Sequence, residues 1–233
     1  MSPVNFDGPE LEAALKGTAG DAQKAACVDF FLLLALCHTV VVEEINGQKR
    51  LSASSPDEAA LVAAAKHFGM EFVSKQHGKV TVLDRLSSVR QVERTFEVLD
   101  VRAHAYASSP APTLSLLSPS ALPPCQLALP RALSHGAAGL HIPRPPRPSQ
   151  VLEFTSARKR MSIIVSDPAT GEVRLLSKGA DNIMMQLLDK QAPELRAKTD
   201  KDMEAHANDG LRTLVVAHKT LDRSAYSSWS ARY

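Results

Sequence analysis

The sequence predicts an α/β (α+β) fold in which helices flank a twisted, mostly antiparallel sheet. Short β-prone runs alternate with turn residues, and longer alanine- or leucine-rich runs begin with helix-start signals. The segment 102–150 breaks this pattern, and we expect it to be a disordered Pro-rich insertion within a single domain that spans 1–233. The net charge of +2 gives no reason to expect binding to nucleic acid.

The first part of the chain is expected to be mostly helical. A short helix is predicted at Glu10–Leu15, and a longer one at 21–37 has apolar residues at helical spacing. The strongest apolar run, 30–42, is shorter than the ~20 residues that a bilayer span needs. We therefore interpret it as a buried helix that leads into a strand at Val40–Val42.

The chain carries three cysteines, Cys27, Cys37 and Cys125, and no CxxC pair. This number and spacing favour buried thiols in a reducing compartment over a disulfide framework. Cys37 and its neighbour His38 are interpreted as core or helix-end residues, because no other potential ligands cluster with them to bind a metal. The N-terminus lacks the basic and apolar regions of a signal peptide.

A further helix has a clear start signal and ends at Gly69. Ser55 occupies the expected cap position, Pro56 follows as the first helical residue, and Glu58 is third. On this local pattern, Glu58 is predicted to reach back to the cap amide in a capping box. Contact between Glu58 and a ligand is the alternative interpretation.

The other elements follow from alternation, helical spacing and turn residues. Strands are expected at Met70–Val73, Val80–Leu83, Phe96–Val101, Met161–Val165, Glu172–Leu176 and Leu211–His218, and helices at Asn182–Asp189, Glu194–Asn208 and from Ser224 onward.

The segment 102–150 holds ten of the fifteen prolines and no Asp, Glu or Lys. Without it, the strand at Phe96–Val101 would continue into Leu152–Phe154 as one alternating strand. We hypothesise that the segment is a retained intron translated in frame. Val101 can be encoded by a codon that begins with GT, and Gln150 by one that ends in AG, as intron boundaries require.

The segment Glu153–Ser162 combines an aromatic ring, hydroxyls and three consecutive cations with the start of a β-prone run. Taken alone, it favours a charged strand edge on a solvated face. Two further polar pairs, Lys178-Gly179 and Arg212-Thr213, are expected at strand ends, and Glu58 at a helix start. Together an aromatic ring, a carboxylate and cations suit a purine nucleotide. The phosphate-binding loops GxxxxGK[ST] and GxGxxG are absent from the sequence.

Five motifs occur in an order that resembles the nucleotide-binding domain of the phospholipid-flippase branch of P-type ATPases. The resemblance covers essentially the whole chain except 102–150, and the motifs are Cys37-His38-Thr39-Val40, Ser55-Pro56-Asp57-Glu58-Ala59-Ala60-Leu61, Glu153-Phe154 through Ser162, Lys178-Gly179-Ala180-Asp181 and Gly210-Leu211-Arg212-Thr213-Leu214.

The resemblance implies that ATP is the ligand and that one group of residues surrounds its adenine. Phe154 would stack on the ring, and Glu58 would accept from its amine or lie beside it. Ser156 and Lys159 would line the same pocket, and Lys178 would reach into its floor.

The resemblance also implies a phosphate side to the pocket, contacted by Arg212 and Thr213. For Arg158 and Arg160, a place at the pocket edge and a place on the surface stay equally open.

The sequence contains no DKTGT motif and no GDGxND segment, so the resemblance implies no catalytic residue and no metal ligand in this chain. The parent protein would place the chain at the cytosolic face of a membrane. There the γ-phosphate would pass to an aspartate outside the chain, and lipid translocation would follow. Mg²⁺ ligands, phosphorylation and actuator domains, membrane helices and a possible accessory subunit would also lie outside it. Alone, the chain is expected to be a soluble cytoplasmic fragment without transport activity.

Two alternatives stay open at this point. The chain could be a stand-alone, non-catalytic adenine-nucleotide-binding or regulatory module. It could also be an inert fragment of a gene model, whose insertion disrupts the pocket.

Overall fold

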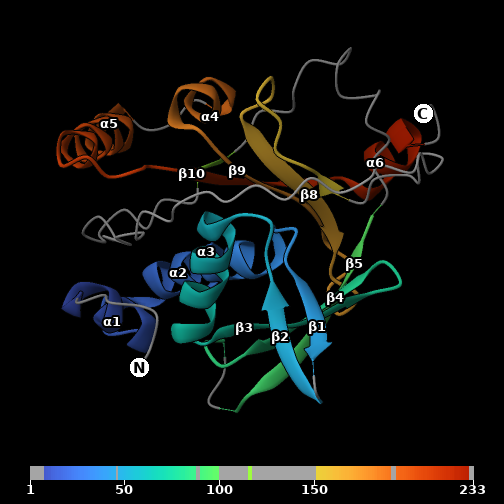
Figure 1. The fold of residues 1–233 in the computed structure, drawn as a ribbon. Helices are drawn as coiled ribbons and strands as arrows, with labels where there is room; N and C mark the ends of the chain where they lie inside the picture. The colour runs from blue at the N-terminus through green and yellow to red at the C-terminus, as the bar shows by residue number, and fades with distance from the viewer. Residues whose placement is uncertain are drawn as a thin grey trace, which may run out of the picture.

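The structure is a computed structural model, and it describes residues 8–45, 47–87, 90–99, 115–116, 151–189 and 193–230. Figure 1 shows how the elements are arranged. In chain order they are α1 (Pro9–Lys16), α2 (Asp21–Leu36), β1 (Val41–Ile45), β2 (Gln48–Ser52), α3 (Pro56–His67), β3 (Met70–Gln76), β4 (Lys79–Asp84), β5 (Val92–Val98), β6 (Ser115–Leu116), β7 (Val151–Leu152), β8 (Arg160–Ser166), β9 (Val173–Gly179), α4 (Asp181–Leu187), α5 (Pro193–Asn208), β10 (Val215–Leu221) and α6 (Arg223–Ser230).

One large sheet organises the fold. Its strands follow the order β3-β4-β5-β8-β9-β10-β6, and β7 also pairs with β8. Every pairing described in this sheet is antiparallel. β1 and β2 form a separate antiparallel hairpin. The predicted α/β class, with a mostly antiparallel sheet flanked by helices, is confirmed.

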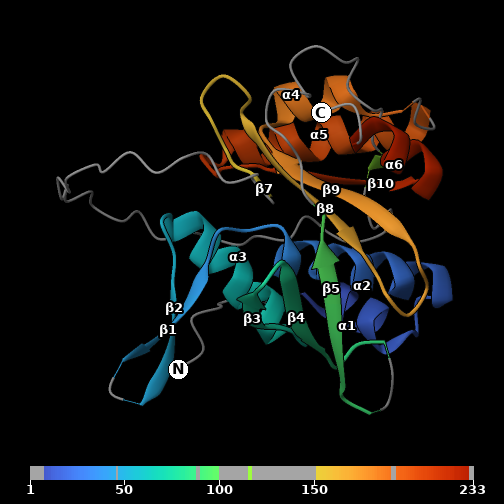
Figure 2. The same ribbon diagram turned by 90° about the vertical axis from the view of Figure 1, so that its right-hand side faces the viewer.

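Helices cover both faces of the sheet where β8, β9 and β10 lie. Helices α1, α2 and α3 lie on one side of these strands, and α4, α5 and α6 on the other (Figures 1 and 2). On β8, Ile163 belongs to a core shared with Phe31 of α2, whereas the next residue, Ile164, belongs to a core shared with Met184 of α4. Burial on both faces explains why this strand reads as an almost unbroken apolar run.

Strands β5 and β7 lie end to end along the same edge of β8. Val98 pairs with Val165, and the Leu99 amide donates to the Ile164 carbonyl at 2.9 Å. The next residue of β8, Ile163, pairs with Val151 of β7. The two short strands therefore occupy consecutive positions of one ladder, as expected of a single strand that is interrupted.

Several predicted bounds differ from the structure. The polar strand β2 was not predicted, because its residues lack the apolar alternation that marks a half-buried strand. The predicted strand 211–218 begins only at Val215, and residues 211–214 have no regular structure. Of the expected insertion 102–150, Ser115–Leu116 form β6 and the rest lies outside the described residues.

Candidate functional site

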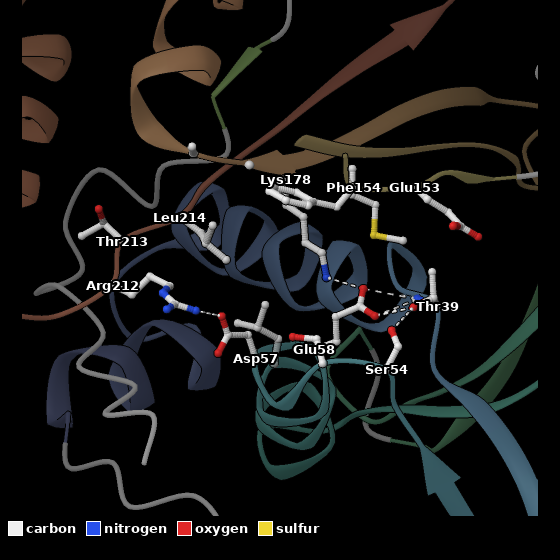
Figure 3. A pocket seen from close by; sticks show the side chains of 15 residues that line it. Thr39, Ser54, Asp57, Glu58, Glu153, Phe154, Lys178, Arg212, Thr213 and Leu214 are labelled. Carbon is white, nitrogen blue, oxygen red and sulfur yellow. Dashed lines mark hydrogen bonds and ion pairs between the residues drawn. The ribbon is translucent and has the colours of Figure 1, made fainter. Parts of the chain in front are cut away.

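A cavity of about 780 Å³ lies between the start of α3 and the ends of β7 and β9. Figure 3 shows the side chains that line it. Its volume is within the ~300–1,000 Å³ range of small-molecule sites in proteins. Its wall is formed by Thr39, Ser54, Ser55, Asp57, Glu58, Leu61, Glu153, Phe154, Met161, Lys178, Gly179, Ala180, Arg212, Thr213 and Leu214.

Glu58 forms the centre of a polar cluster in this wall. The Thr39 hydroxyl donates to Glu58 Oε2 at 2.5 Å, and the Thr39 amide lies 3.3 Å from each carboxylate oxygen. On the other side, Lys178 Nζ lies 3.5 Å from Glu58 Oε1 (Figure 3). The side chains of Glu58 and Lys178 are only 13% and 7% exposed, so this pair is well shielded from solvent.

The predicted capping box at the start of α3 is wrong. Ser55 does stand at the N-cap, but its side chain makes no capping hydrogen bond. The Glu58 carboxylate extends toward Thr39 and Lys178. There it interacts with the Lys178 ammonium and with the amide and hydroxyl of Thr39. These interactions outweigh one hydrogen bond from the cap amide, since interactions with a charged partner are the stronger ones.

Lys178 presents a buried ammonium to the cavity. Its Nζ forms an ion pair with Glu58 Oε1 at 3.5 Å, but it makes no hydrogen bond to any of the described residues. An ammonium has three donors, and burying them without acceptors costs free energy. The site therefore favours a ligand that brings acceptor atoms to Lys178.

Gly179 allows two strands to approach closely beside Lys178. A Cβ atom at this position would lie 2.6 Å from Arg160 Cβ and 2.7 Å from the Lys159 carbonyl oxygen. The Ala180 amide donates to that same carbonyl at 2.9 Å. Lys159 itself has a φ of 49°, in the left-handed region. Lys178 therefore supplies the cation in the cavity wall, and the next residue, Gly179, leaves room for the start of β8 to pack against β9.

The loop between β7 and β8 is held by its own side chains. Arg158 donates to the Glu153 carbonyl at 2.9 Å, and Arg160 donates to the Arg158 carbonyl at 3.3 Å. The Lys159 amide bonds to the Thr155 carbonyl at 2.7 Å. Neither Arg158 nor Arg160 belongs to the cavity wall, so both arginines support the loop in this structure.

Of the residues predicted in this loop, Phe154 reaches the cavity. Its ring lies at the rim and is 59% exposed, which is high for a large apolar side chain. Ser156 and Lys159 are exposed on the adjoining turn and are not part of the wall.

Arg212 and Thr213 lie at the opposite end of the wall (Figure 3). Arg212 forms an ion pair with Asp57, the residue before Glu58 on α3, and the arginine side chain is 70% exposed. The predicted cation of the phosphate side therefore already has a carboxylate partner.

Cys37 and His38 belong to the core, as the sequence predicted. Burial raises the pKa of the Cys37 thiol to about 11, so it stays protonated at neutral pH. Burial also lowers the pKa of His38 to about 4, and its Nε2 bonds to the Ala35 carbonyl at 2.9 Å. Within the ranges that the structure describes, no group of three or more His, Cys, Asp or Glu is arranged to hold a metal ion.

Comparison with known proteins matches residues 147–232 to the family model described as P-type ATPase, cytoplasmic domain N. A probable phospholipid-transporting ATPase 11 from Arabidopsis thaliana is 33% identical over 99% of this chain. The chain belongs to the P-type ATPases. Within that family, the resemblance to the phospholipid-transporting members that the five motifs predicted is confirmed.

Other P-type ATPases of the same kind match over most of the chain. The phospholipid-transporting ATPase IC of Xenopus tropicalis is 33% identical over 88% of it, and the phospholipid-transporting ATPase DNF1 of Saccharomyces cerevisiae is 31% identical over 99%. The chain spans 16% of the Arabidopsis protein and 12% of each of the other two. In the described part of the chain, we find no helix with the length and apolar character of a bilayer span.

Five polar residues of the wall were not predicted from the sequence as site residues: Thr39, Ser54, Ser55, Asp57 and Glu153. Two of them, Thr39 and Asp57, contact the predicted residues Glu58 and Arg212. Both stand inside motifs that carried the resemblance, but neither was given a role. The sequence does give a signal for Asp57: it lies in the first turn of a predicted helix, where a carboxylate is exposed at the helix end and can pair with a cation. Thr39 gave no comparable signal, because its contact with Glu58 depends on how α2 and α3 pack.

Proposed function

We propose that this chain binds ATP as the cytosolic nucleotide-binding domain of a phospholipid-translocating P-type ATPase. The observation that carries the proposal is the position of the Lys178 ammonium, which is buried in the wall of a cavity of about 780 Å³. It forms an ion pair with Glu58 at 3.5 Å but makes no hydrogen bond to any described residue. Membership of the P-type ATPase family, by residues 147–232, supports the same assignment.

The chemistry of the wall fits an adenine base. The exposed Phe154 ring offers a face for stacking, and Glu58 can accept a hydrogen bond from the exocyclic amine. Lys178 can donate to a ring nitrogen, which would give its ammonium an acceptor. Ser156 and Lys159, on the turn beside Phe154, are proposed to contact the ligand at its edge.

The phosphate side of the ligand is assigned to Arg212 and Thr213. Arg212 is largely exposed at the end of the wall, so its guanidinium can turn from Asp57 toward a phosphate. Such a contact is charge-assisted and can be bidentate.

The rest of the transport cycle is proposed to take place in a parent protein at the cytosolic face of a membrane. Because the sequence has no DKTGT motif, the aspartate that accepts the γ-phosphate would lie outside this chain. The same holds for the Mg²⁺ ligands, the phosphorylation and actuator domains, the membrane helices and any accessory subunit. This chain would present ATP to that aspartate, and phosphorylation there would drive lipid translocation.

ATP binding by the full chain, measured by isothermal titration calorimetry, tests the proposal. The variant Lys178→Met keeps the length and packing of the side chain and removes its donors. We expect it to weaken ATP binding by about 10-fold or more, because a hydrogen bond to a charged group contributes ~1.5–3 kcal/mol.

The matched control is Lys198→Met, which removes an exposed lysine that pairs with Asp202 on α5, away from the cavity. It should bind ATP like the unchanged chain. Equal affinity of the Lys178→Met and Lys198→Met variants, or no ATP binding by the unchanged chain, would contradict the proposal.

A further inference from the structure

Thr39 contacts the Glu58 carboxylate through both its backbone and its side chain. It lies between the end of α2 and β1, and it directs both its amide and its hydroxyl to the same carboxylate. The 2.5 Å contact from its hydroxyl to Glu58 Oε2 is the shortest of these. The hydroxyl is itself 3.3 Å from the Ser54 hydroxyl, a second group that holds it in place.

These contacts limit what the Glu58 carboxylate can still accept. An ionised carboxylate has roughly four lone-pair directions. The Thr39 amide and hydroxyl and the Lys178 ammonium approach it from the sides, as Figure 3 shows. Because Glu58 also lines the cavity, a direction toward the cavity is left for a donor on a ligand.

A fixed carboxylate that faces the 6-position distinguishes two purines that bind in the same orientation by the group they carry there. Adenine carries an amine there, which donates a hydrogen bond to a carboxylate. Guanine carries a carbonyl oxygen, which would face the carboxylate as a second acceptor. A carboxylate free to rotate could turn away from that oxygen, whereas one held in place cannot, and rejection of this kind is a large source of specificity.

We propose that Thr39 is a positioning residue that fixes the Glu58 carboxylate and thereby makes the cavity selective for adenine over guanine nucleotides. The inference rests on the proposed function, because it requires that a purine nucleotide occupies the cavity. It assigns Thr39 an effect through Glu58 and no direct contact with the ligand.

The test compares ATP and GTP affinities, by calorimetry, in the full chain and in Thr39→Val, which keeps the shape of the side chain and loses its hydroxyl. We expect the ATP-over-GTP preference to fall about 2- to 10-fold, the range for one hydrogen bond. Thr39→Ser, which retains the hydroxyl, should keep the preference of the unchanged chain. A purely structural role would change both affinities together and leave their ratio constant.

The matched control is Thr81→Val, which removes a hydroxyl that pairs with Thr95 on the exposed part of β4 and β5. It should keep the nucleotide preference. If Thr39→Val does not fold, as judged by circular dichroism, Thr39→Ala provides the same comparison with a smaller side chain.

An ATP-over-GTP ratio that is unchanged in folded Thr39→Val or Thr39→Ala overturns the inference. So does a loss in Thr39→Ser as large as the loss in Thr39→Val. Failure of the unchanged chain to bind ATP is a different result, and it overturns the proposed function itself.

Discussion

Two neighbouring carboxylates of α3, Asp57 and Glu58, each face a cation from the second half of the chain. Glu58 is shielded and lies near the buried Lys178, whereas Asp57 pairs with the exposed Arg212. The shielded pair shapes the floor of the cavity. The exposed pair is expected to contribute little stability, since surface ion pairs contribute ~0–1 kcal/mol. Its role is better sought in ligand binding.

Replacing Asp57 by Asn is expected to strengthen ATP binding by about 2- to 5-fold. The substitution removes a negative charge near the proposed phosphate side and frees Arg212, and the size of the gain follows from the ~0–1 kcal/mol of an exposed pair. Calorimetry with adenosine is the control, because a ligand without phosphates should bind both forms equally. Weaker ATP binding by Asp57→Asn would contradict this prediction. It would show that the ion pair with Asp57 positions Arg212 for the ligand.

His38 makes the stability of the fold depend on pH. Its pKa is lowered to about 4 by burial, from 6.5 in the unfolded chain. Below pH 6.5 the unfolded state therefore takes up a proton that the folded state does not. Stability is full above pH 6.5 and falls as the pH drops toward 4, by ~2 kcal/mol between pH 7.5 and pH 5.

Urea unfolding at pH 7.5 and pH 5 measures this loss, and His38→Gln should reduce it. Burial also lowers the pKa of His218, which adds a loss of the same sign. The control is His67→Gln, at the exposed end of α3. If the free energy of unfolding falls equally between pH 7.5 and pH 5 in the unchanged chain and in His38→Gln, His38 is not the cause of the loss.

The arrangement of the site depends on how closely β8 and β9 approach each other. Gly179 ends β9 directly against Lys159 and Arg160 at the start of β8. The loop between β7 and β8 is held by Arg158 and carries Phe154 at the cavity rim. The close contact of Gly179 with Lys159 and Arg160 therefore helps to position β8, the loop before it and the floor of the cavity.

Gly179→Ala is expected to lower the free energy of unfolding by ~1–3 kcal/mol, the usual cost of overpacking. ATP binding should weaken as well, because Lys178 and the loop would be displaced. Thermal unfolding and calorimetry measure the two effects. Gly47→Ala, in the β1–β2 hairpin, is the control: its Cβ meets nothing within 4 Å, so the change adds only backbone strain at a φ of 75°. The control is expected to lose stability of the same order, ~1–3 kcal/mol, but to keep its ATP affinity. Equal ATP affinity of Gly179→Ala and Gly47→Ala would contradict the prediction.

Local signals predicted some elements well. Helices α2, α3 and α5 lie within a residue or two of their predicted bounds, because caps, glycines and helical spacing act over a few residues. The strand predicted at 211–218 starts late: it begins only at Val215, and residues 212–214 form part of the cavity wall. Apolar composition alone does not distinguish a strand from a wall segment.

Within the candidate site, most of the residues predicted from the motifs do line the cavity. Phe154, Lys178, Glu58, Arg212 and Thr213 all line the cavity, whereas Ser156 and Lys159 lie on the turn beside it. The motif places these two residues next to Phe154 in sequence but does not say which way the turn directs them. That direction is set by Lys159 at its positive φ and by the hydrogen bonds around it.

In the large sheet, β5 and β7 lie end to end along β8, in the positions that one continuous strand would occupy. Leu99 and Val151 bond to consecutive residues of β8, although residues 100–150 separate them in sequence. This register supports the proposal that the chain is a single nucleotide-binding domain interrupted by an insertion. We further propose that 102–150 is a retained intron. Transcript sequencing tests it, and a segment present in every mature message would overturn it.

Joining Leu99 directly to Val151 should give a chain that folds and is more stable by ~1–3 kcal/mol. Closing a loop of about 50 residues costs ~3 kcal/mol, and losing the two pairs between β6 and β10 offsets part of this gain. Urea unfolding measures the change, and ATP binding should be retained. A chain with an equal-length Gly-Ser linker is the control and should resemble the parent. Unfolding of the shortened chain would show that the segment is part of the fold.

The cavity is shared between the two sides of the interruption. Thr39, Asp57 and Glu58 precede it in the chain, and Phe154, Lys178 and Arg212 follow it. A ligand in the cavity therefore holds together two parts of the chain, and it binds only when they are assembled. These parts also meet where β5 pairs with β8 and where α2 packs against the sheet. ATP at 100 times its dissociation constant would raise the free energy of unfolding by ~2.7 kcal/mol. The nucleotide would then act as a removable cross-link, and the melting temperature would report how much of it is bound.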